Sequence, residues 1–206
     1  MGSPYRVRRI FKPIVVWIAK LVHKIGLLPN HITILMLLTS IAACITISFA
    51  DLFWVFGILT FLTGILDGVD GALARLSGKS TKFGAFFDST LDRMSEIMLF
   101  LGLFLNGHFF LYGEAFHQSI IILTMFSSLM ISYVRSRAES ISDSDFDVGV
   151  FARSERLFSL FLICVIPFKI VYSIGIILIG IGILSTFVYR TVVIGKVLKK
   201  TITQKE

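Results

Sequence analysis

The chain has 206 residues, of which 55% are hydrophobic, and its mean hydropathy is +0.86. This apolar content exceeds that of a soluble domain of similar size, so we interpret the chain as an integral membrane protein. The net charge of +7 would suggest nucleic-acid binding in a soluble protein. In a membrane protein the positive-inside rule explains it, and we expect no nucleic-acid partner.

The first segment, residues 3 to 26, has the pattern of an amphipathic helix. Its apolar stripe is formed by Val7, Ile10, Phe11, Ile14, Trp17, Ile18, Leu21 and Val22, while Arg6, Arg9, Lys12, Lys20 and Lys24 lie elsewhere. Such a helix buries one side in lipid and holds anionic headgroups with the other. We therefore predict a juxtamembrane helix within residues 1–28, in the cytoplasmic interface. A mere basic leader is the alternative.

The rest of the chain consists mainly of apolar runs that begin after Pro29. They cover residues 31–50, 52–75, 86–108, 116–135, 156–168 and 170–190. Each is close to the ~20 residues that cross a bilayer, although the fifth is short and its boundary with the sixth stays open. The prediction is an all-α membrane protein with six transmembrane helices in a domain over 29–195. A basic cytoplasmic tail, 196–206, follows.

The basic residues give this chain an orientation. With six spans, nineteen of the 20 Lys and Arg residues fall on one side of the membrane, and Lys169 alone falls on the other. Positive residues collect on the cytoplasmic side of membrane proteins. We therefore predict a multi-pass protein of the cell membrane whose two termini are cytoplasmic.

Two aspartates lie near the end of the second apolar run and two lie near the start of the third. Asp67 and Asp70 are three residues apart and Asp88 and Asp92 are four apart, so each pair projects from one face of its helix. Two helix ends would then aim four carboxylates at one another on the cytoplasmic side. Burying carboxylates beside hydrocarbon without a compensating charge costs too much free energy, so we expect divalent cations to bind them. Oxygen ligands without His or Cys favour magnesium, manganese or calcium over zinc.

The spacing around these aspartates suggests a bound pyrophosphate. Gly71 and Gly84 allow close approach of a ligand to the backbone, and Arg75 supplies a forked donor suited to a phosphate. The pattern from Asp67 to Asp92 is D-x-x-D-G-x-x-A-R, eight residues, then G-x-x-x-D-x-x-x-D. It resembles the signature of the CDP-alcohol phosphatidyltransferase family at every fixed position.

The resemblance implies a transferase that moves a phosphatidyl-type group from CDP-diacylglycerol or CDP-archaeol to an alcohol and releases CMP. Two cations, Mg²⁺ or Mn²⁺, can neutralise a pyrophosphate and polarise the attacked phosphorus. Asp67, Asp70 and Asp88 are the expected shared ligands. The family pattern assigns Asp92 a double role, as a further ligand and as the base that accepts the hydroxyl proton of the acceptor. It also implies a homodimer.

Similarity to family positions that contact the nucleotide points to a further set of residues. The predicted CDP-lipid site comprises Asn30, His31, Ile32, Thr33, Gly71, Ala74, Arg75, Thr81 and Gly84. Simple helix capping would equally explain Asn30 and Thr33, and an interfacial charge would explain Arg75.

A cluster of arginines follows the fourth span and precedes the fifth. The patterns S-Y-V-R-S-R-A-E and R-S-E-R resemble the inositol-phosphate branch of the family, whose acceptor is inositol 1-phosphate. The predicted acceptor-phosphate site contains Ser132, Arg135, Arg137, Arg153 and Arg156. Ordinary positive-inside arginines are the alternative. Nearby, Glu96 either pairs with Arg93 or extends the hydrogen-bond shell of Asp92.

Three other functions are consistent with parts of the pattern. The same chemistry with glycerol 3-phosphate as acceptor would also use a basic pocket. A cation transporter would explain acidic residues in membrane spans, although no inverted repeat is apparent. A degenerate scaffold that only binds nucleotide lipid is disfavoured by the complete set of four aspartates.

Overall fold

Every regular element in the described part of the chain is an α-helix. The computed structural model describes residues 7–106, 112–142, 146, 148–149, 151–166 and 168–203. Its helices are α1 (Val7–Lys24), α2 (Pro29–Ala50), α3 (Phe53–Leu76), α4 (Lys82–Leu105), α5 (Glu114–Glu139), α6 (Arg153–Val165) and α7 (Lys169–Thr203). The all-α prediction is confirmed. The ends of the predicted terminal segments, residues 1–6 and 204–206, lie outside the described residues.

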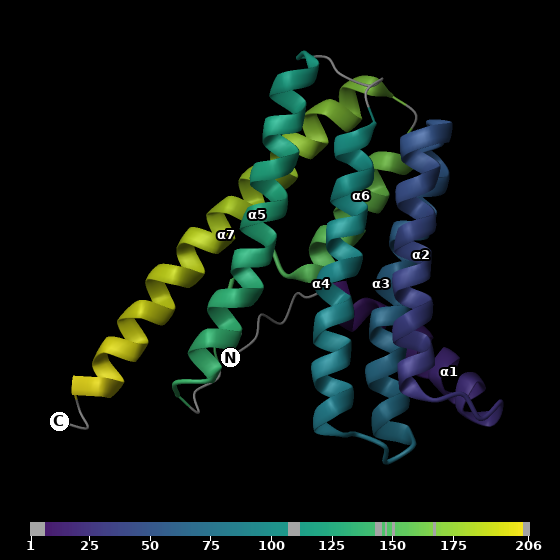
Figure 1. Cartoon of the computed structure of the whole chain (residues 1–206), viewed down its shortest axis with the longest axis vertical. Coiled ribbons are helices and arrows are strands. Elements are labelled where there is room, and N and C mark those ends of the chain that lie inside the picture. Colours follow the sequence, from purple (N-terminus) through teal and green to yellow (C-terminus); the bar gives the residue numbers. More distant parts are fainter. Residues whose placement is uncertain are drawn as a thin grey trace.

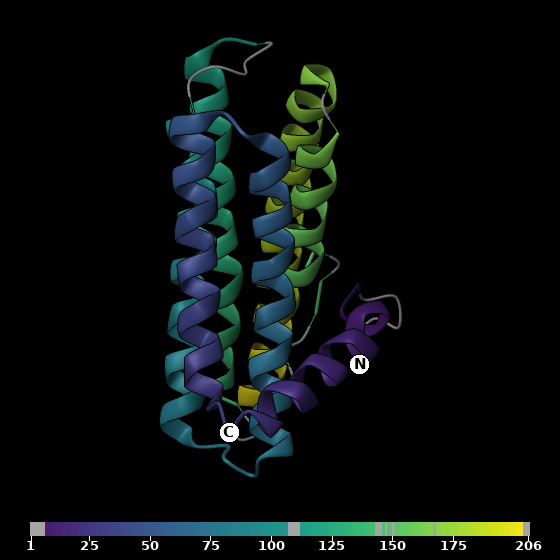
Figure 2. The same ribbon diagram turned by 90° about the vertical axis from the view of Figure 1, so that its right-hand side faces the viewer.

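The long helices form two groups that meet along the bundle. Helix α2 packs against α3 and α4, α3 also packs against α6, and α5 pairs with α7. Figure 1 shows α5 and α7 diverging from the α2–α3–α4 group toward the lower end of the view. The turn between α3 and α4 also lies at this end, and α1 crosses it at an angle to the long helices (Figure 2).

Within the described ranges, four helices are long and apolar enough to cross a membrane: α2, α3, α5 and the part of α7 from Lys169 to Lys199. Helix α4 has 24 residues but carries several charged side chains in its first half. Helix α6 has 13 residues and is therefore about 20 Å long, which is shorter than the hydrocarbon core. The described residues thus indicate a membrane protein with four candidate spanning helices.

Two helix boundaries differ from the apolar runs for local reasons. Helix α4 begins at Lys82 rather than at residue 86, because the Thr81 hydroxyl accepts a hydrogen bond from the Gly84 amide at 2.9 Å and caps the helix. Helix α7 continues to Thr203 rather than ending near residue 190. Apolar residues continue beyond Arg190, with Val192, Val193, Ile194 and Leu198, so this single arginine does not end the helix.

Helix α1 has a protein-facing side and an exposed apolar side. Val15 and Ala19 are buried, whereas Ile10 and Trp17 are 71% and 63% exposed. Val15 packs on α3 at Gly68, where an added Cβ would lie 3.1 Å from a Val15 methyl group. The Phe11 ring contacts rings of both α3 and α6. Helix α1 is therefore attached to the two helices that it crosses, and its exposed apolar side faces away from them.

Candidate active site

Three carboxylates converge between α3 and α4. Oxygen atoms of Asp67, Asp88 and Asp92 all lie within 4.8 Å of one another. Asp67 lies nine residues before the end of α3 and Asp92 ten residues after the start of α4, which places both about 14–15 Å along their helices. The carboxylates therefore lie deeper in the bundle than the helix ends at which we expected them.

Asp70 completes the group from one turn further along α3. Its side chain is buried and lies within hydrogen-bonding reach of Asp88. The Thr33 hydroxyl donates to Asp70 Oδ2 at 3.0 Å, and the Gly71 amide donates to Asp70 Oδ1 at 2.5 Å. The four aspartates predicted to face one another are thus together, and α2 contributes a donor that orients one of them.

These carboxylates line a cavity of about 520 Å³ that α3, α4, α5, α6 and α7 enclose. Its walls carry six acidic and six basic side chains together with polar and small residues. They are Asp67, Asp70, Gly71, Arg75, Asp88, Ser89, Asp92, Arg93, Glu96, Ile131, Ser132, Arg135, Ser136, Glu139, Ala152, Arg153, Ser154, Arg156 and Arg190. The formal charge of this lining is zero, so binding of cations in the cavity favours simultaneous binding of anions.

Arg153 reaches the aspartates from the first turn of α6. Its Nη1 atom lies 2.6 Å from Asp67 Oδ1 and also contacts Asp92 Oδ1. The Arg153 side chain is 17% exposed, and its Nε atom has no hydrogen-bond partner among the described residues. A residue predicted to bind an acceptor phosphate therefore contacts two predicted metal ligands.

Arg156 is held by a different acidic residue. Its Nε and Nη2 atoms donate to the two oxygens of Glu96 at 2.6 and 3.0 Å, and Nη1 donates to the Phe151 carbonyl at 3.1 Å. Both charged side chains are almost fully buried. Glu96 thus pairs with Arg156 rather than with Arg93, whose guanidinium contacts Ser89. A direct role for Arg156 at the acceptor stays a prediction.

The remaining members of the predicted acceptor site lie on α5. Ser132 and Arg135 line the cavity, and Arg135 forms an exposed pair with Glu139 at 2.7 Å. Arg137 is exposed, donates to the Ser140 hydroxyl at 3.4 Å and is not part of the cavity wall. The fold therefore brings four of the five predicted acceptor residues to one cavity and places Arg137 outside it.

The predicted nucleotide residues are divided between the cavity and the core. Asn30 from α2 meets the start of α4: an added Cβ on Gly84 would lie 3.0 Å from Thr81 Oγ1 and 3.7 Å from Asn30 Oδ1. Gly71 and Arg75 line the cavity itself. The close approach predicted for Gly84 is thus an approach to Asn30 and Thr81.

Three other residues of the predicted nucleotide site do not line the cavity. His31 Nδ1 accepts a hydrogen bond from the Leu28 amide at 3.4 Å, which is a helix-capping contact. Ile32 is buried in a hydrophobic cluster with Val15 and Leu73. Ala74 is half-buried and does not line the cavity. Nucleotide contacts by these three residues stay predictions.

Arg190 is a cavity residue that the sequence pattern did not single out. Its guanidinium donates to the Val148 carbonyl at 2.7 Å and to the Ile131 carbonyl at 3.3 Å, and the side chain is buried. In the sequence it appears as one of several basic residues after the last apolar run. The predicted last apolar run ends at residue 190, whereas the helix continues for another 13 residues. The apolar runs therefore did not show that Arg190 lies within a helix.

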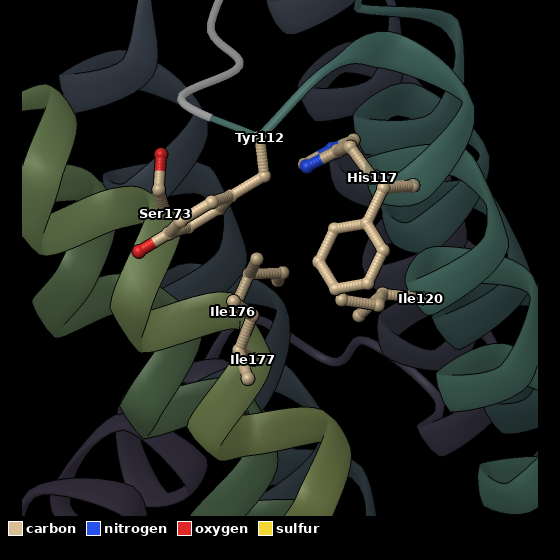
Figure 3. Close-up of a pocket in the computed structure, with 7 residues that line it drawn as sticks. Tyr112, His117, Ile120, Ser173, Ile176 and Ile177 are labelled. Atoms are coloured by element: carbon tan, nitrogen blue, oxygen red, sulfur yellow. The ribbon is translucent and has the colours of Figure 1, made fainter.

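A second pocket lies near the opposite end of the bundle, between α5 and α7. Figure 3 shows Tyr112, His117 and Ser173 around it, together with isoleucines of both helices. The pocket holds about 10 Å³, which is at the lower limit for one water molecule. It is too small for a substrate.

Thr33 provides a test of the aspartate arrangement. Thr33→Val keeps the side-chain shape and removes the hydrogen bond to Asp70. Loss of such an orienting partner typically lowers metal affinity about 10- to 100-fold. We expect that loss in a Mn²⁺ titration of the purified protein. Thr46→Val is the matched control, because Thr46 donates only to a carbonyl of its own helix, and this variant should bind Mn²⁺ as the wild type does.

Comparisons with known proteins all match the chain to one enzyme family. The family model for CDP-alcohol phosphatidyltransferase matches residues 26–196. An archaetidylinositol phosphate synthase from Pyrococcus horikoshii is 34% identical over 84% of this chain and 86% of its own length. A phosphatidylinositol phosphate synthase from Mycobacterium tuberculosis is 34% identical over 75% of this chain and 70% of its own.

Solved structures resemble the chain over the same region. The crystal structure of the Mycobacterium tuberculosis phosphatidylinositol phosphate synthase with CDP-DAG bound has a TM-score of 0.76 at 28% identity, and covers 88% of this chain and 94% of that one. The structure of that enzyme in complex with manganese and citrate has a TM-score of 0.75 at 28% identity, and covers 87% and 88%.

Proposed function

Because the chain belongs to the CDP-alcohol phosphatidyltransferase family, we propose that it transfers a phosphatidyl-type group from a CDP-linked lipid to inositol 1-phosphate and releases CMP. The names of the relatives that cover most of the chain support this acceptor. The observation that carries the proposal is the single cavity in which four aspartates face a group of arginines. Membership of an enzyme family favours this function over a cation transporter.

The aspartates fit a divalent metal centre. The oxygens of Asp67, Asp88 and Asp92 are close enough together to surround a hard cation, and these carboxylates contribute oxygen donors only. We propose two ions, Mg²⁺ or Mn²⁺, held by these three residues and Asp70; the manganese complex of the mycobacterial enzyme supports a divalent metal. When bound, such ions neutralise the pyrophosphate and polarise the attacked phosphorus.

The protein side chains would align the acceptor with the lipid phosphorus. Asp92 takes the proton from the acceptor hydroxyl while the hydroxyl oxygen bonds to the lipid phosphorus. The bond between that phosphorus and the bridging oxygen breaks, and the oxygen leaves with CMP. Arg75 and Gly71 border the cavity where a pyrophosphate would lie, and Asn30, Thr81 and Gly84 adjoin one another beside the start of α4. Fixing the hydroxyl next to its base contributes much of the effect that we attribute to Asp92.

The acceptor phosphate would lie among Ser132, Arg135 and Arg153. A phosphate monoester carries close to two negative charges, and several forked cationic donors in one cavity match it. Arg135 and Ser132 come from α5 and Arg153 from α6, so two helices bring the three to the same cavity. An uncharged alcohol would form no ion pair with these arginines. This charge match is why we propose a phosphorylated acceptor.

The membrane arrangement that we propose uses all six helices after α1. Helices α2 to α7 cross the bilayer, α1 lies in the cytoplasmic interface, and the cavity opens on the cytoplasmic side. The segregation of basic residues supports this orientation. Four of the five charged residues of α4 line the cavity, and ion pairing of Asp92 and Glu96 reduces the cost of their burial in the membrane. A homodimer is proposed on the resemblance to the family alone.

An acceptor screen tests the proposed function. Purified protein with CDP-diacylglycerol or CDP-archaeol and Mg²⁺ or Mn²⁺ should release CMP with inositol 1-phosphate and not with free inositol. Removing the metal with EDTA should stop the release. Rapid metal-dependent release with glycerol 3-phosphate and none with inositol 1-phosphate would assign the enzyme to the glycerophosphate branch instead.

A further inference from the structure

Two arginines of α6 pair with acidic residues of α4 in two successive layers. Arg156 and Glu96 form the inner layer, and Arg153 with Asp92 forms the outer one, which also includes Asp67 of α3. The inner pair is bidentate and almost fully buried, and Arg156 uses its Nε and both Nη atoms in hydrogen bonds. The outer arginine is less completely satisfied, because its Nε has no hydrogen-bond partner among the described residues.

The outer layer overlaps the proposed metal centre. Arg153 Nη1 contacts Asp67 Oδ1 and Asp92 Oδ1, and both residues belong to the group whose oxygens lie within 4.8 Å. A divalent ion bound by these oxygens would meet a positive guanidinium at hydrogen-bonding distance from the same atoms. Like charges at that separation repel strongly, so the ion and the guanidinium compete for the two carboxylates.

The cavity has room for a second position of the Arg153 guanidinium, away from the two aspartates. Arg153 lines the same cavity as Ser132 and Arg135. The backbone of α6 is held three residues further on by the buried pair of Arg156 with Glu96, so a change at Arg153 involves its side chain and not the helix. A released guanidinium and Arg135 together present two forked donors to a phosphate.

We propose that Arg153 is an exchangeable counter-ion: it neutralises Asp67 and Asp92 in the metal-free protein, and metal binding releases it to an anionic phosphate in the same cavity. Metal and phosphate then bind with positive cooperativity, because each favours the same released position of one side chain. Linkage makes the coupling reciprocal. This inference rests on the metal centre of the proposed function.

Mn²⁺ binding without lipid substrate tests the exchange. Detergent-purified, EDTA-stripped protein is titrated with Mn²⁺, and free Mn²⁺ is measured by its EPR signal, with and without low millimolar inorganic phosphate as the probe. In the wild type, phosphate should tighten Mn²⁺ binding about fivefold or more, in the usual range of coupling between two sites. No phosphate effect in the wild-type protein would overturn the proposal, and this measurement needs no variant.

Arg153→Gln sharpens the test by removing the competitor. Without phosphate this variant should bind Mn²⁺ about tenfold more tightly than the wild type, and phosphate should no longer change its affinity. Lys20→Gln removes one exposed charge from α1 and should match the wild type in both measurements. Equal or weaker Mn²⁺ binding by Arg153→Gln would show that Arg153 does not compete with the metal.

Parallel CMP measurements separate this inference from the proposed function. Wild-type protein that releases CMP with inositol 1-phosphate but shows no phosphate-linked Mn²⁺ affinity refutes the counter-ion exchange alone. Phosphate-linked Mn²⁺ binding without CMP release from the CDP-lipid in the presence of any sugar-alcohol phosphate refutes the proposed acceptor and supports the exchange.

Discussion

Asp92→Asn should lower the rate of CMP release by about 10²–10⁴-fold, the usual contribution of a general base. Asparagine keeps the size of the side chain and one oxygen, but it cannot accept a proton from the acceptor hydroxyl. Binding of the CDP-lipid should be largely unchanged, because Asp67, Asp70 and Asp88 remain in the cavity. The measurement pairs initial rates of CMP release with calorimetric binding of CDP-lipid.

Two comparison variants make this result specific to Asp92. Asp88→Ala removes a proposed metal ligand and should abolish both CMP release and metal binding. Asp51→Asn changes an aspartate at the far end of α2, where its carboxylate accepts a hydrogen bond from Asn106, and should leave the rate unchanged. A normal rate for Asp92→Asn would remove Asp92 from the reaction.

Arg156→Met should destabilise the protein by about 3–5 kcal/mol, the usual cost of removing one partner of a buried ion pair. The substitution leaves Glu96 buried without its two charged hydrogen bonds. Because this pair joins α4 to the start of α6, the loss should appear as a lower midpoint of thermal unfolding in detergent.

The second Arg–Glu pair of the cavity provides a control for this stability effect. Arg135 and Glu139 are one helical turn apart, and their side chains are 41% and 43% exposed. Arg135→Met should change stability by no more than about 0.5 kcal/mol. Similar losses in Arg135→Met and Arg156→Met would show that burial of the Glu96 pair is not what stabilises the junction of α4 and α6.

The sequence was sufficient for those features that depend on local spacing. Apolar runs located the long helices, and the three- and four-residue spacing of the aspartates predicted that each pair projects from one helix face. Thr81 as a cap was missed, because hydropathy does not respond to a hydroxyl before a helix. The extension of α7 was missed because the predicted span ended at Arg190, although apolar residues continue beyond it. Both features are still local and lie within reach of a propensity analysis.

The pairing of charges within the cavity depends on contacts far apart in the chain. Arg153 and Asp67 are 86 residues apart, and Arg156 and Glu96 are 60 apart. Arg153 and Arg156 look alike in the sequence, three residues apart in one basic segment. Only the fold, in which α6 packs against α3, directs one to the proposed metal ligands and the other to a buried glutamate. Arg137 is separated from the group because it lies on the exposed side of α5 and does not line the cavity.

The contact between α1 and Gly68 links the bilayer to the chemistry. Gly68 stands between Asp67 and Asp70, and Val15 packs directly on it, while the opposite side of α1 presents Ile10 and Trp17 outward. Lateral pressure or curvature stress that tilts α1 would therefore act on the helix turn that carries two of the carboxylates. The catalytic rate of this protein should vary with the physical state of the lipid around it.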